Sequence, residues 1–243
     1  MASEGFIDLH AHVLFGVDDG PSTLEESFDV IQGMVSMGFG TVYATPHQRV
    51  DLYTPALGRV REVCEELRGA LVSKGVSLDL HFGAENCWDS LLFERSQAGE
   101  IPSYEGTRAF LVEMPGPFLP AGVERQLFEW RRAGLLPVVA HVERYLGTPQ
   151  LLERAQEISG AGVVSCNLES LGGGMGRKVA KTARAMVLER IAQVLCSDIH
   201  GEPWLKPTAK GLRWVRRHLP PQEVERLLVD NPRRILAGEL PES

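Results

Sequence analysis

Histidine and carboxylate residues recur where short apolar runs end, and such runs are typical of β-strands. The informative positions are His10, His12, His47, Glu85, Glu113, His141 and His200. His141, for example, directly follows the run from Leu136 to Ala140, and Asp198 follows the run from Val194 to Ser197. The strand ends of a parallel barrel meet at one mouth, where side chains distant in sequence can share a metal ion. This pattern therefore predicts a metal site at the carboxyl ends of parallel strands.

Strand-like and helix-like segments alternate along the chain, which favours an α/β fold with a parallel sheet. We expect about seven strands, helices at roughly 55–73, 121–134, 148–160 and 175–189, and a helical tail from about residue 206. A doubly wound open sheet fits the same alternation. Ligands at six strand ends converge on one point only if the sheet closes. We therefore predict a single-domain, distorted (β/α)7 TIM-like barrel that spans residues 1–243.

The first helix has a recognisable start and end in the sequence. Ser22, with Glu25 three residues later, has the spacing of a capping box. An apolar stripe at helical spacing then runs from Leu24 to Val35 and stops at Gly38. The pattern predicts a helix that begins after Ser22.

The charge distribution excludes several partners. The formal net charge is −7, and the most basic stretch, Arg177 to Arg184, is interpreted as the exposed face of a helix. Binding to nucleic acid or to an anionic membrane is therefore not expected. The sequence has no apolar stretch of about 18 residues and no visible signal peptide, so we expect a cytoplasmic protein without membrane insertion.

The four cysteines bear on the reaction type. Cys64, Cys87, Cys166 and Cys196 are far apart in sequence and form no CxxC pair, which indicates reduced, buried thiols. None of them is followed six residues later by arginine, as cysteine-dependent phosphatases require. A covalent phosphocysteine route is therefore not expected.

The two histidines of His10-Ala11-His12 have the spacing of two metal ligands on one strand. Residues i and i+2 of a strand point to the same face, so both imidazoles can reach one ion. Together with the other residues at strand ends, this pair indicates metal binding rather than two ordinary polar residues leaving a strand.

These residues resemble the polymerase-and-histidinol-phosphatase (PHP) superfamily, and most closely its bacterial capsule-type protein-tyrosine phosphatases. The similarity covers nearly the whole chain in order. It rests on Asp8-Leu9-His10-Ala11-His12, Gly16-Val17-Asp18-Asp19-Gly20-Pro21, Ala44-Thr45-Pro46-His47, Gly83-Ala84-Glu85, Leu111-Val112-Glu113, Ala140-His141-Val142-Glu143-Arg144, Ser197-Asp198-Ile199-His200 and Asp230-Asn231-Pro232-Arg233.

The resemblance implies a seven-stranded distorted barrel with three divalent metal ions, commonly manganese, although iron and zinc suit the same ligands. Asp19 is taken as the ligand in preference to Asp18. The implied division is His10, His12, Glu85 and Asp198 for the first ion, Glu85, Glu113 and His141 for the second, and Asp19, His47 and His200 for the third.

The implied site has a charge that suits a phosphate monoester. Three divalent ions outweigh the four carboxylates of Asp19, Glu85, Glu113 and Asp198 by about two charges. We expect hydrolysis by a metal-activated water, with Arg144 gripping the phosphate bidentately. A phenolate is a good leaving group, so phosphotyrosine hydrolysis does not require a dedicated general acid.

One position departs from the family pattern. Where the family usually has an arginine followed by proline, shortly after the Asp-x-His motif, this chain has Lys206-Pro207. Lysine supplies positive charge but no planar two-pronged donor. Lys206 is therefore a candidate catalytic cation, and Arg49 is a candidate that could compensate for the missing arginine.

The leading hypothesis is a metal-dependent protein-tyrosine phosphatase. Its implied substrate is a phosphotyrosine protein, namely a bacterial tyrosine kinase that controls exopolysaccharide or capsule synthesis. Two alternatives stay open: a small-molecule phosphatase such as one acting on histidinol phosphate, and a non-catalytic, metal-stabilised regulatory barrel. The sequence leaves the oligomeric state open.

Overall fold

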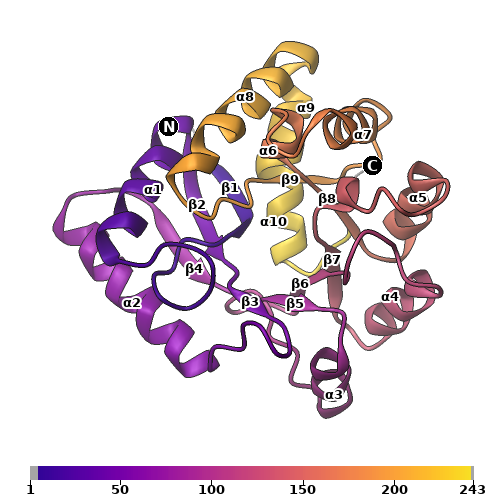
Figure 1. Cartoon of the computed structure of the whole chain (residues 1–243), viewed down its shortest axis with the longest axis horizontal. Helices are drawn as coiled ribbons and strands as arrows, with labels where there is room; N and C mark the ends of the chain where they lie inside the picture. Colours follow the sequence, from indigo (N-terminus) through magenta and orange to yellow (C-terminus); the bar gives the residue numbers. More distant parts are fainter. Residues whose placement is uncertain (1–4, 242–243) are drawn as a thin grey trace.

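Parallel strands and helices alternate along the chain, and the helices are arranged around the strands (Figure 1). The computed structural model describes residues 5–241. The strands are β1 (Phe6–Ala11), β2 (Phe39–Ala44), β3 (His47–Gln48), β4 (Asp79–Phe82), β5 (Glu85–Cys87), β6 (Ala109–Glu113), β7 (Leu136–Val139), β8 (Val163–Asn167) and β9 (Val194–Cys196).

The helices fill the connections between strands and the C-terminal region. They are α1 (Leu24–Met37), α2 (Leu57–Ser73), α3 (Ser90–Ala98), α4 (Val123–Arg132), the 3₁₀ turn η1 (Val142–Arg144), α5 (Leu151–Ala161), α6 (Leu168–Leu171), α7 (Arg177–Leu188), α8 (Glu202–His218), α9 (Pro221–Glu225), the π-helical turn η2 (Arg226–Asp230) and α10 (Asn231–Leu236).

The strands form two sheets in which every pairing is parallel. One sheet has the order β1-β2-β4 and the other the order β3-β5-β6-β7-β8-β9. Two backbone hydrogen bonds join the end of β1 to the segment after β9: Asp198 N–H donates to His10 O and His12 N–H donates to Ile199 O, both at 2.8 Å. The predicted α/β class with parallel strands is confirmed.

The nine described strands correspond to seven paths, because two paths are interrupted. Thr45-Pro46 separates β2 from β3, and Gly83-Ala84 separates β4 from β5. Proline has no N–H to donate to a ladder, which explains the first break. The chain continues in the same direction after each break, so His47 and Glu85 begin a second short strand instead of ending the first.

Two apolar clusters follow the alternation of side chains along each strand. In β6, Phe110 and Val112 pack outward against the surrounding helices, whereas Ala109 and Leu111 face an inner cluster. Ile235 of α10 also belongs to the inner cluster, so the C-terminal helix closes this core from one side.

The predictions for three helices were wrong or incomplete. Thr23 is the N-cap of α1, because its side chain accepts from Glu26 N–H, while the Glu26 carboxylate accepts from Ser22 N–H. The capping interaction therefore lies one residue later than predicted. The helix α3 was not predicted, and α8 begins at Glu202 rather than near residue 206.

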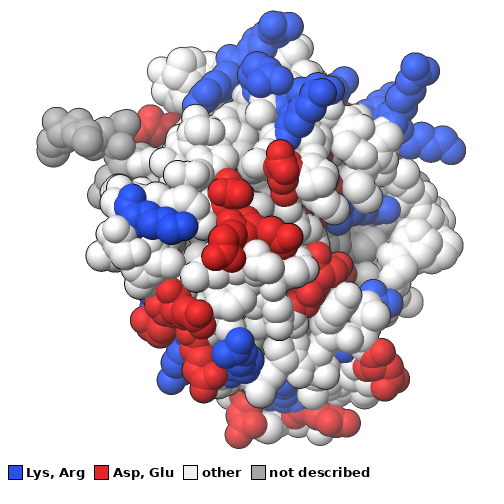
Figure 2. Space-filling model, turned by 60° about the vertical axis from the view of Figure 1, so that its left-hand side comes forward, with Lys and Arg blue, Asp and Glu red and all other residues white. Residues whose placement is uncertain are grey.

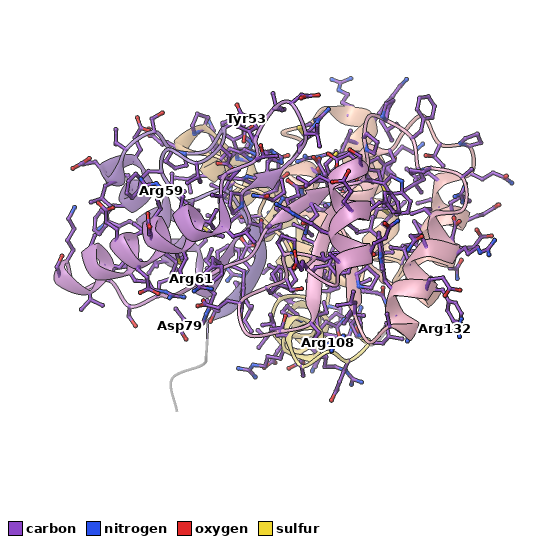
Figure 3. All side chains as sticks on the ribbon, turned by 90° about the horizontal axis from the view of Figure 1, so that it is seen from below. Tyr53, Arg59, Arg61, Asp79, Arg108 and Arg132 are labelled. Carbon is purple, nitrogen blue, oxygen red and sulfur yellow. The ribbon has the colours of Figure 1, made fainter. Side chains whose placement is uncertain are left out.

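The two ends of the strands lie on opposite sides of the molecule. Figure 3 shows Tyr53, five residues after β3, at the upper edge of that view. Asp79, the first residue of β4, and Arg108, which precedes β6, lie at the lower edge. The strands therefore run upward in Figure 3, and their carboxyl ends form the mouth where the candidate ligands gather.

Candidate metal centre

All nine predicted metal ligands lie together at the carboxyl ends of the strands. They come from β1 and the loop after it, from β3, β5 and β6, and from the residues that follow β7 and β9. The set is His10, His12, Asp19, His47, Glu85, Glu113, His141, Asp198 and His200. Within it, three groups have ligand atoms that all lie within 4.8 Å of one another.

The first group contains His10, His12 and Asp198. His10 Nε2 lies 3.2 Å from His12 Nε2, 3.1 Å from Asp198 Oδ1 and 3.3 Å from Glu85 Oε1. All four side chains are buried. The His10/His12 pair therefore points to one face of β1, as its i and i+2 spacing predicts.

The second group contains Asp19, His47 and His200, together with His12. Asp19 Oδ1 lies 3.4 Å from His47 Nε2 and 3.5 Å from His200 Nε2. The His12 and His200 rings stack with their centroids 3.9 Å apart. Asp19 is the exposed member, so this group forms the solvent side of the centre.

The third group contains His47, Glu85 and Glu113. His47 Nδ1 lies 2.9 Å from Glu85 Oε2, and His141 Nε2 lies 3.0 Å from Glu85 Oε1 and 4.0 Å from Glu113 Oε2. Glu85 contacts four of the histidines, which makes it the residue that joins the groups.

Two residues of the centre have left-handed backbone conformations. His141 follows β7 with φ 36°, and Asp198 follows β9 with φ 53°. Such conformations are unfavourable for residues other than glycine and persist where the surrounding structure holds them. Both residues end a strand abruptly, which turns their side chains into the mouth.

The ionisation of the centre reflects its crowded carboxylates and imidazoles. Burial alone would lower the pKa of His47, but hydrogen bonds to Asp19 and Glu85 raise it to about 10. Burial and the neighbouring His12 lower the pKa of His200 to about 4. Burial and the charge of Glu85 raise the pKa of Glu113.

The donor atoms fit divalent metal ions. Within residues 5–241, Glu113 Oε1 is buried without a hydrogen-bond partner, and His47 Nδ1 and Glu85 Oε2 are buried 2.9 Å apart without the angles of a regular hydrogen bond. Buried polar atoms are rarely left unsatisfied, and these three belong to the third group. Mixed imidazole and carboxylate ligation suits manganese, iron and zinc.

Asp18 has a role that the sequence did not reveal. Its Oδ2 lies 2.6 Å from His12 Nδ1 and accepts from His47 N–H, while its Oδ1 accepts from Gly20 N–H. Burial would raise the pKa of Asp18, but the interaction with His12 lowers it to about 2. The Asp18 carboxylate therefore holds the Nδ1 proton of His12 and directs Nε2 into the centre. The Asp18-Asp19 doublet was the only available signal.

We expect Asp18→Asn to weaken metal binding about tenfold to a hundredfold, because the partner that fixes the His12 tautomer loses its charge. Competition with a fluorescent chelator measures this affinity. Asp29→Asn, an exposed residue of α1, is the matched control. An unchanged affinity in Asp18→Asn would show that His12 needs no carboxylate partner.

Arg144 lies beside the centre within a buried polar network. A terminal nitrogen of its guanidinium lies 2.6 Å from both Asp198 Oδ2 and Glu169 Oε1, and Asn167 Nδ2 donates to Asp198 Oδ2 at 2.9 Å. Burial opposes its charge, but Asp198, Glu143 and Glu169 raise the pKa of Arg144. Asn167 and Glu169 lie outside the motifs of the sequence and were not predicted as site residues.

The other two candidate cations are less closely associated with the centre. Arg49 is exposed in the turn after β3, where its charge partly opposes the rise in the pKa of Glu113. Lys206 is exposed in the second turn of α8, and the described residues give it no ion pair. Trp204 precedes it, with its ring centroid 5.6 Å from that of His200, and thus borders the mouth.

The four cysteine thiols are poor candidates for a nucleophile. All four are free and buried, as expected. Burial raises the pKa of the Cys64 and Cys87 thiols to about 12. A thiolate is therefore disfavoured at neutral pH.

Histidine and carboxylate ligands at the carboxyl ends of parallel strands define the class of metal-dependent α/β enzymes. The family model for capsular polysaccharide synthesis, CpsB/CapC, matches residues 6–237, and the chain belongs to this family. The predicted resemblance is thus confirmed.

Curated relatives cover most of the chain. The tyrosine-protein phosphatase CpsB of Streptococcus agalactiae is 26% identical over 237 residues, which cover 95% of this chain and 98% of that protein. The tyrosine-protein phosphatase YwqE of Bacillus subtilis is 26% identical over 197 residues, covering 80% of this chain and 77% of YwqE.

Solved structures agree on the fold. A structure described as one of YwqE from Bacillus subtilis and CpsB from Streptococcus pneumoniae, unique metal-dependent tyrosine phosphatases, superposes with a TM-score of 0.86. It is 23% identical and covers 97% of this chain and 96% of that one. Histidinol phosphate phosphatase from Lactococcus lactis gives a TM-score of 0.56 at 12% identity, over 88% of this chain and 93% of that one. No helix within residues 5–241 has the length and hydropathy needed to cross a bilayer.

Proposed function

We propose that this protein hydrolyses phosphotyrosine in a protein substrate at a centre of three divalent metal ions, commonly manganese. The observation that carries the proposal is the set of three overlapping ligand groups at the strand ends, with Glu85 contacting four histidines. The tyrosine-phosphatase names of the relatives that cover most of the chain support the choice of reaction.

The chain's own residues bind and orient the phosphate. Bound divalent ions would supply a water of lowered pKa and positive charge for the phosphoryl oxygens. Arg144, fixed by Asp198 and Glu169, lies where its guanidinium can grip a phosphate. Arg49 and Lys206 add positive charge at the rim. The phenolate leaves without a dedicated acid, since its parent pKa is about 10.

The proposed substrate is a tyrosine-phosphorylated kinase of the bacterial cytoplasm that controls exopolysaccharide or capsule synthesis. The family's role in capsular polysaccharide synthesis supports this assignment. A comparison of phosphotyrosine peptide with histidinol phosphate distinguishes this function from that of a small-molecule phosphatase. Preferred turnover of histidinol phosphate would contradict it.

We further propose that residues 1–243 form one distorted barrel of seven strand paths. The hydrogen bonds between the end of β1 and the segment after β9 support closure, as does the inner apolar cluster. A crystal structure in which these two edges are separated by solvent would contradict this proposal.

Hydrolysis of p-nitrophenyl phosphate tests the reaction class. We expect activity with added manganese and loss of nearly all activity after a chelator, with recovery on re-addition of metal. A thiol-blocking reagent should leave the rate unchanged, because the four cysteines are buried and their thiols are held protonated. Activity that survives chelation but is lost to the thiol reagent would overturn the metal-dependent reaction.

Metal binding is expected to release protons. The pKa of His47 is about 10 without metal, so its ring is protonated at pH 7, and the carboxylates of Asp18 and Glu85 outweigh burial and raise the pKa of His12. Metal ligation needs neutral imidazole, so binding at pH 7 releases the proton of His47, and affinity rises with pH up to about 10. Calorimetric titration with Mn²⁺ in two buffers of different ionisation enthalpy measures the release. Equal binding enthalpies in both buffers would contradict it.

A further inference from the structure

A concentrated positive face lies outside the metal centre on a chain whose net charge is −7. We define the basic face as Arg177, Lys181 and Arg184 of α7 with Lys206, Lys210, Arg213 and Arg217 of α8. Figure 2 shows Lys and Arg side chains gathered at the top of the molecule, the side where α8 lies in Figure 1. Such a concentration against the overall charge points to an anionic partner.

Helix geometry aligns these charges along two neighbouring helices. The four α8 residues are spaced by four, three and four positions, and the three α7 residues by four and three. This spacing places each set on one face of its helix. Arg184 of α7 lies over the Trp214 ring of α8, 5.5 Å from its centroid, so the two stripes meet.

The basic face is hollowed rather than flat. A cavity of about 280 Å³ between the helices is lined by Arg184, Lys210, Arg213, Trp214 and Arg217. A second cavity of about 620 Å³ along α7 is lined by Arg177, Lys181 and Arg184. Glu189 is the one carboxylate among the residues that line these two cavities. A groove of this kind suits an extended chain.

The α8 cations of the basic face have no carboxylate partner among the described residues, whereas Arg184 of α7 donates to Leu171 O. Within residues 5–241, Lys210, Arg213 and Arg217 make no ion pair with a carboxylate, and all three are exposed. Like charges repel along a helix, so a basic stripe without acidic partners slightly lowers the stability of the unbound protein. Binding of an acidic segment would relieve this repulsion.

Two glycines allow α8 to pack close to α6. The loop that follows α6 leads to α7. A Cβ at Gly211 would lie 1.8 Å from Leu168 O, and one at Gly172 would lie 2.0 Å from Pro207 O. Larger residues would push the helices apart. The glycine-rich stretch from Gly172 to Gly176 therefore helps to set the wall of the groove, in addition to forming the loop that enters α7.

The basic stripe of α8 begins beside the mouth of the metal centre, because the ring of Trp204, two residues before Lys206, has its centroid 5.6 Å from that of His200. Lys206 lies six residues after His200, and Arg177 begins the helix that follows the loop after β8. The stripe from Lys206 to Arg217 is about 16 Å long at about 1.5 Å per residue. About five extended residues span it. A peptide held at the mouth could therefore lay its neighbouring segment along the basic face.

We propose that the basic face binds an acidic segment of the phosphotyrosine protein substrate, about five to ten residues from the phosphotyrosine. This inference rests on the proposed function. Its hollowed surface and the start of its α8 stripe beside the mouth favour an extended peptide over a membrane surface. Charge complementarity at such a face acts mainly on substrate association, so it lowers KM and leaves kcat nearly unchanged.

The test compares two phosphotyrosine peptides on the manganese-loaded full chain, one neutral and one with glutamates at this distance on either side. We expect wild type to favour the acidic peptide about tenfold in kcat/KM, and to lose this preference at high salt. The variant Lys210→Ala/Arg213→Ala/Arg217→Ala should lose the preference and keep its rate on p-nitrophenyl phosphate. That rate also reports that the variant is folded.

The matched control is Arg59→Ala/Arg125→Ala/Arg132→Ala, which removes the same charge from α2 and α4. It should keep the preference. An equal preference in the α8 variant and wild type would overturn the inference and leave the proposed function intact. Absence of phosphotyrosine hydrolysis in wild type would overturn both. The protein could instead sediment with anionic vesicles in a way that depends on the three α8 residues, and show no preference between the peptides. That result would assign the face to a membrane and overturn the inference.

Discussion

Glu85→Gln is expected to reduce phosphatase activity about a thousandfold or more and to lower the metal content of the purified protein. The Glu85 carboxylate lies within 3.3 Å of the ring nitrogens of His10, His12, His47 and His141. Its pKa is well below the ordinary value, because the neighbouring His10 and three histidine hydrogen bonds outweigh the effect of burial. The neutral amide keeps the shape but removes the charge that joins the three ligand groups.

Elemental analysis and p-nitrophenyl phosphate turnover measure the two effects of this change together. Glu153→Gln makes the same substitution at an exposed position of α5 and should retain metal and activity. Full metal content together with full activity in Glu85→Gln would show that Glu85 does not bridge the centre.

Arg144→Lys is expected to lower kcat/KM for phosphotyrosine peptide about a hundredfold, with little change in metal content. Lysine keeps the positive charge beside Asp198. Its ammonium group lacks the planar guanidinium that can donate to Asp198, Glu169 and a phosphate at the same time. The charge retained on lysine protects the buried carboxylates, so the variant should fold.

Steady-state kinetics with metal saturation separates this effect from loss of metal. Arg154→Lys is the matched control, because Arg154 forms an ion pair with Glu124 and contacts none of the nine candidate ligands. The same assay on Arg49→Ala and Lys206→Ala ranks the two rim cations, and unchanged kcat/KM in both would remove them from the mechanism. Wild-type kinetics in Arg144→Lys would show that charge alone suffices at this position.

Most of the candidate ligand residues could be picked out from the sequence because they lie near short apolar, strand-like runs. A short apolar run that ends in His or Glu, as at His141 and Glu113, marks both a strand and its exit. The full set of nine, including Asp19 in the loop after β1, followed only from the resemblance to the family. Their division among ions does not, because His47 has one ring nitrogen near Asp19 and the other near Glu85.

The first and last residues of helices were harder to predict from the sequence, because competing capping signals can lie one residue apart. Ser22-Thr23 offers two hydroxyl caps and Glu25-Glu26 two carboxylates, and the packing of α1 selects Thr23 with Glu26. The helix α8 contains Pro207 inside the helix, where proline is unfavourable, and the predicted start near residue 206 lies four residues after the observed start at Glu202. Burial of Thr208, Leu212 and Val215 outweighs this local preference.

The sequence by itself determined the α/β class, the parallel strands and the candidate ligand residues, because these depend on residue type, short-range periodicity and motif resemblance. Only the tertiary structure decided that Asp18 lies against His12, that Glu169 and Asn167 contact Arg144 and Asp198, and that basic residues of α7 and α8 line one cavity. Each of these relations joins a side chain to a group on another element or in a separate turn. Their proximity follows from how the chain packs, which no local pattern encodes.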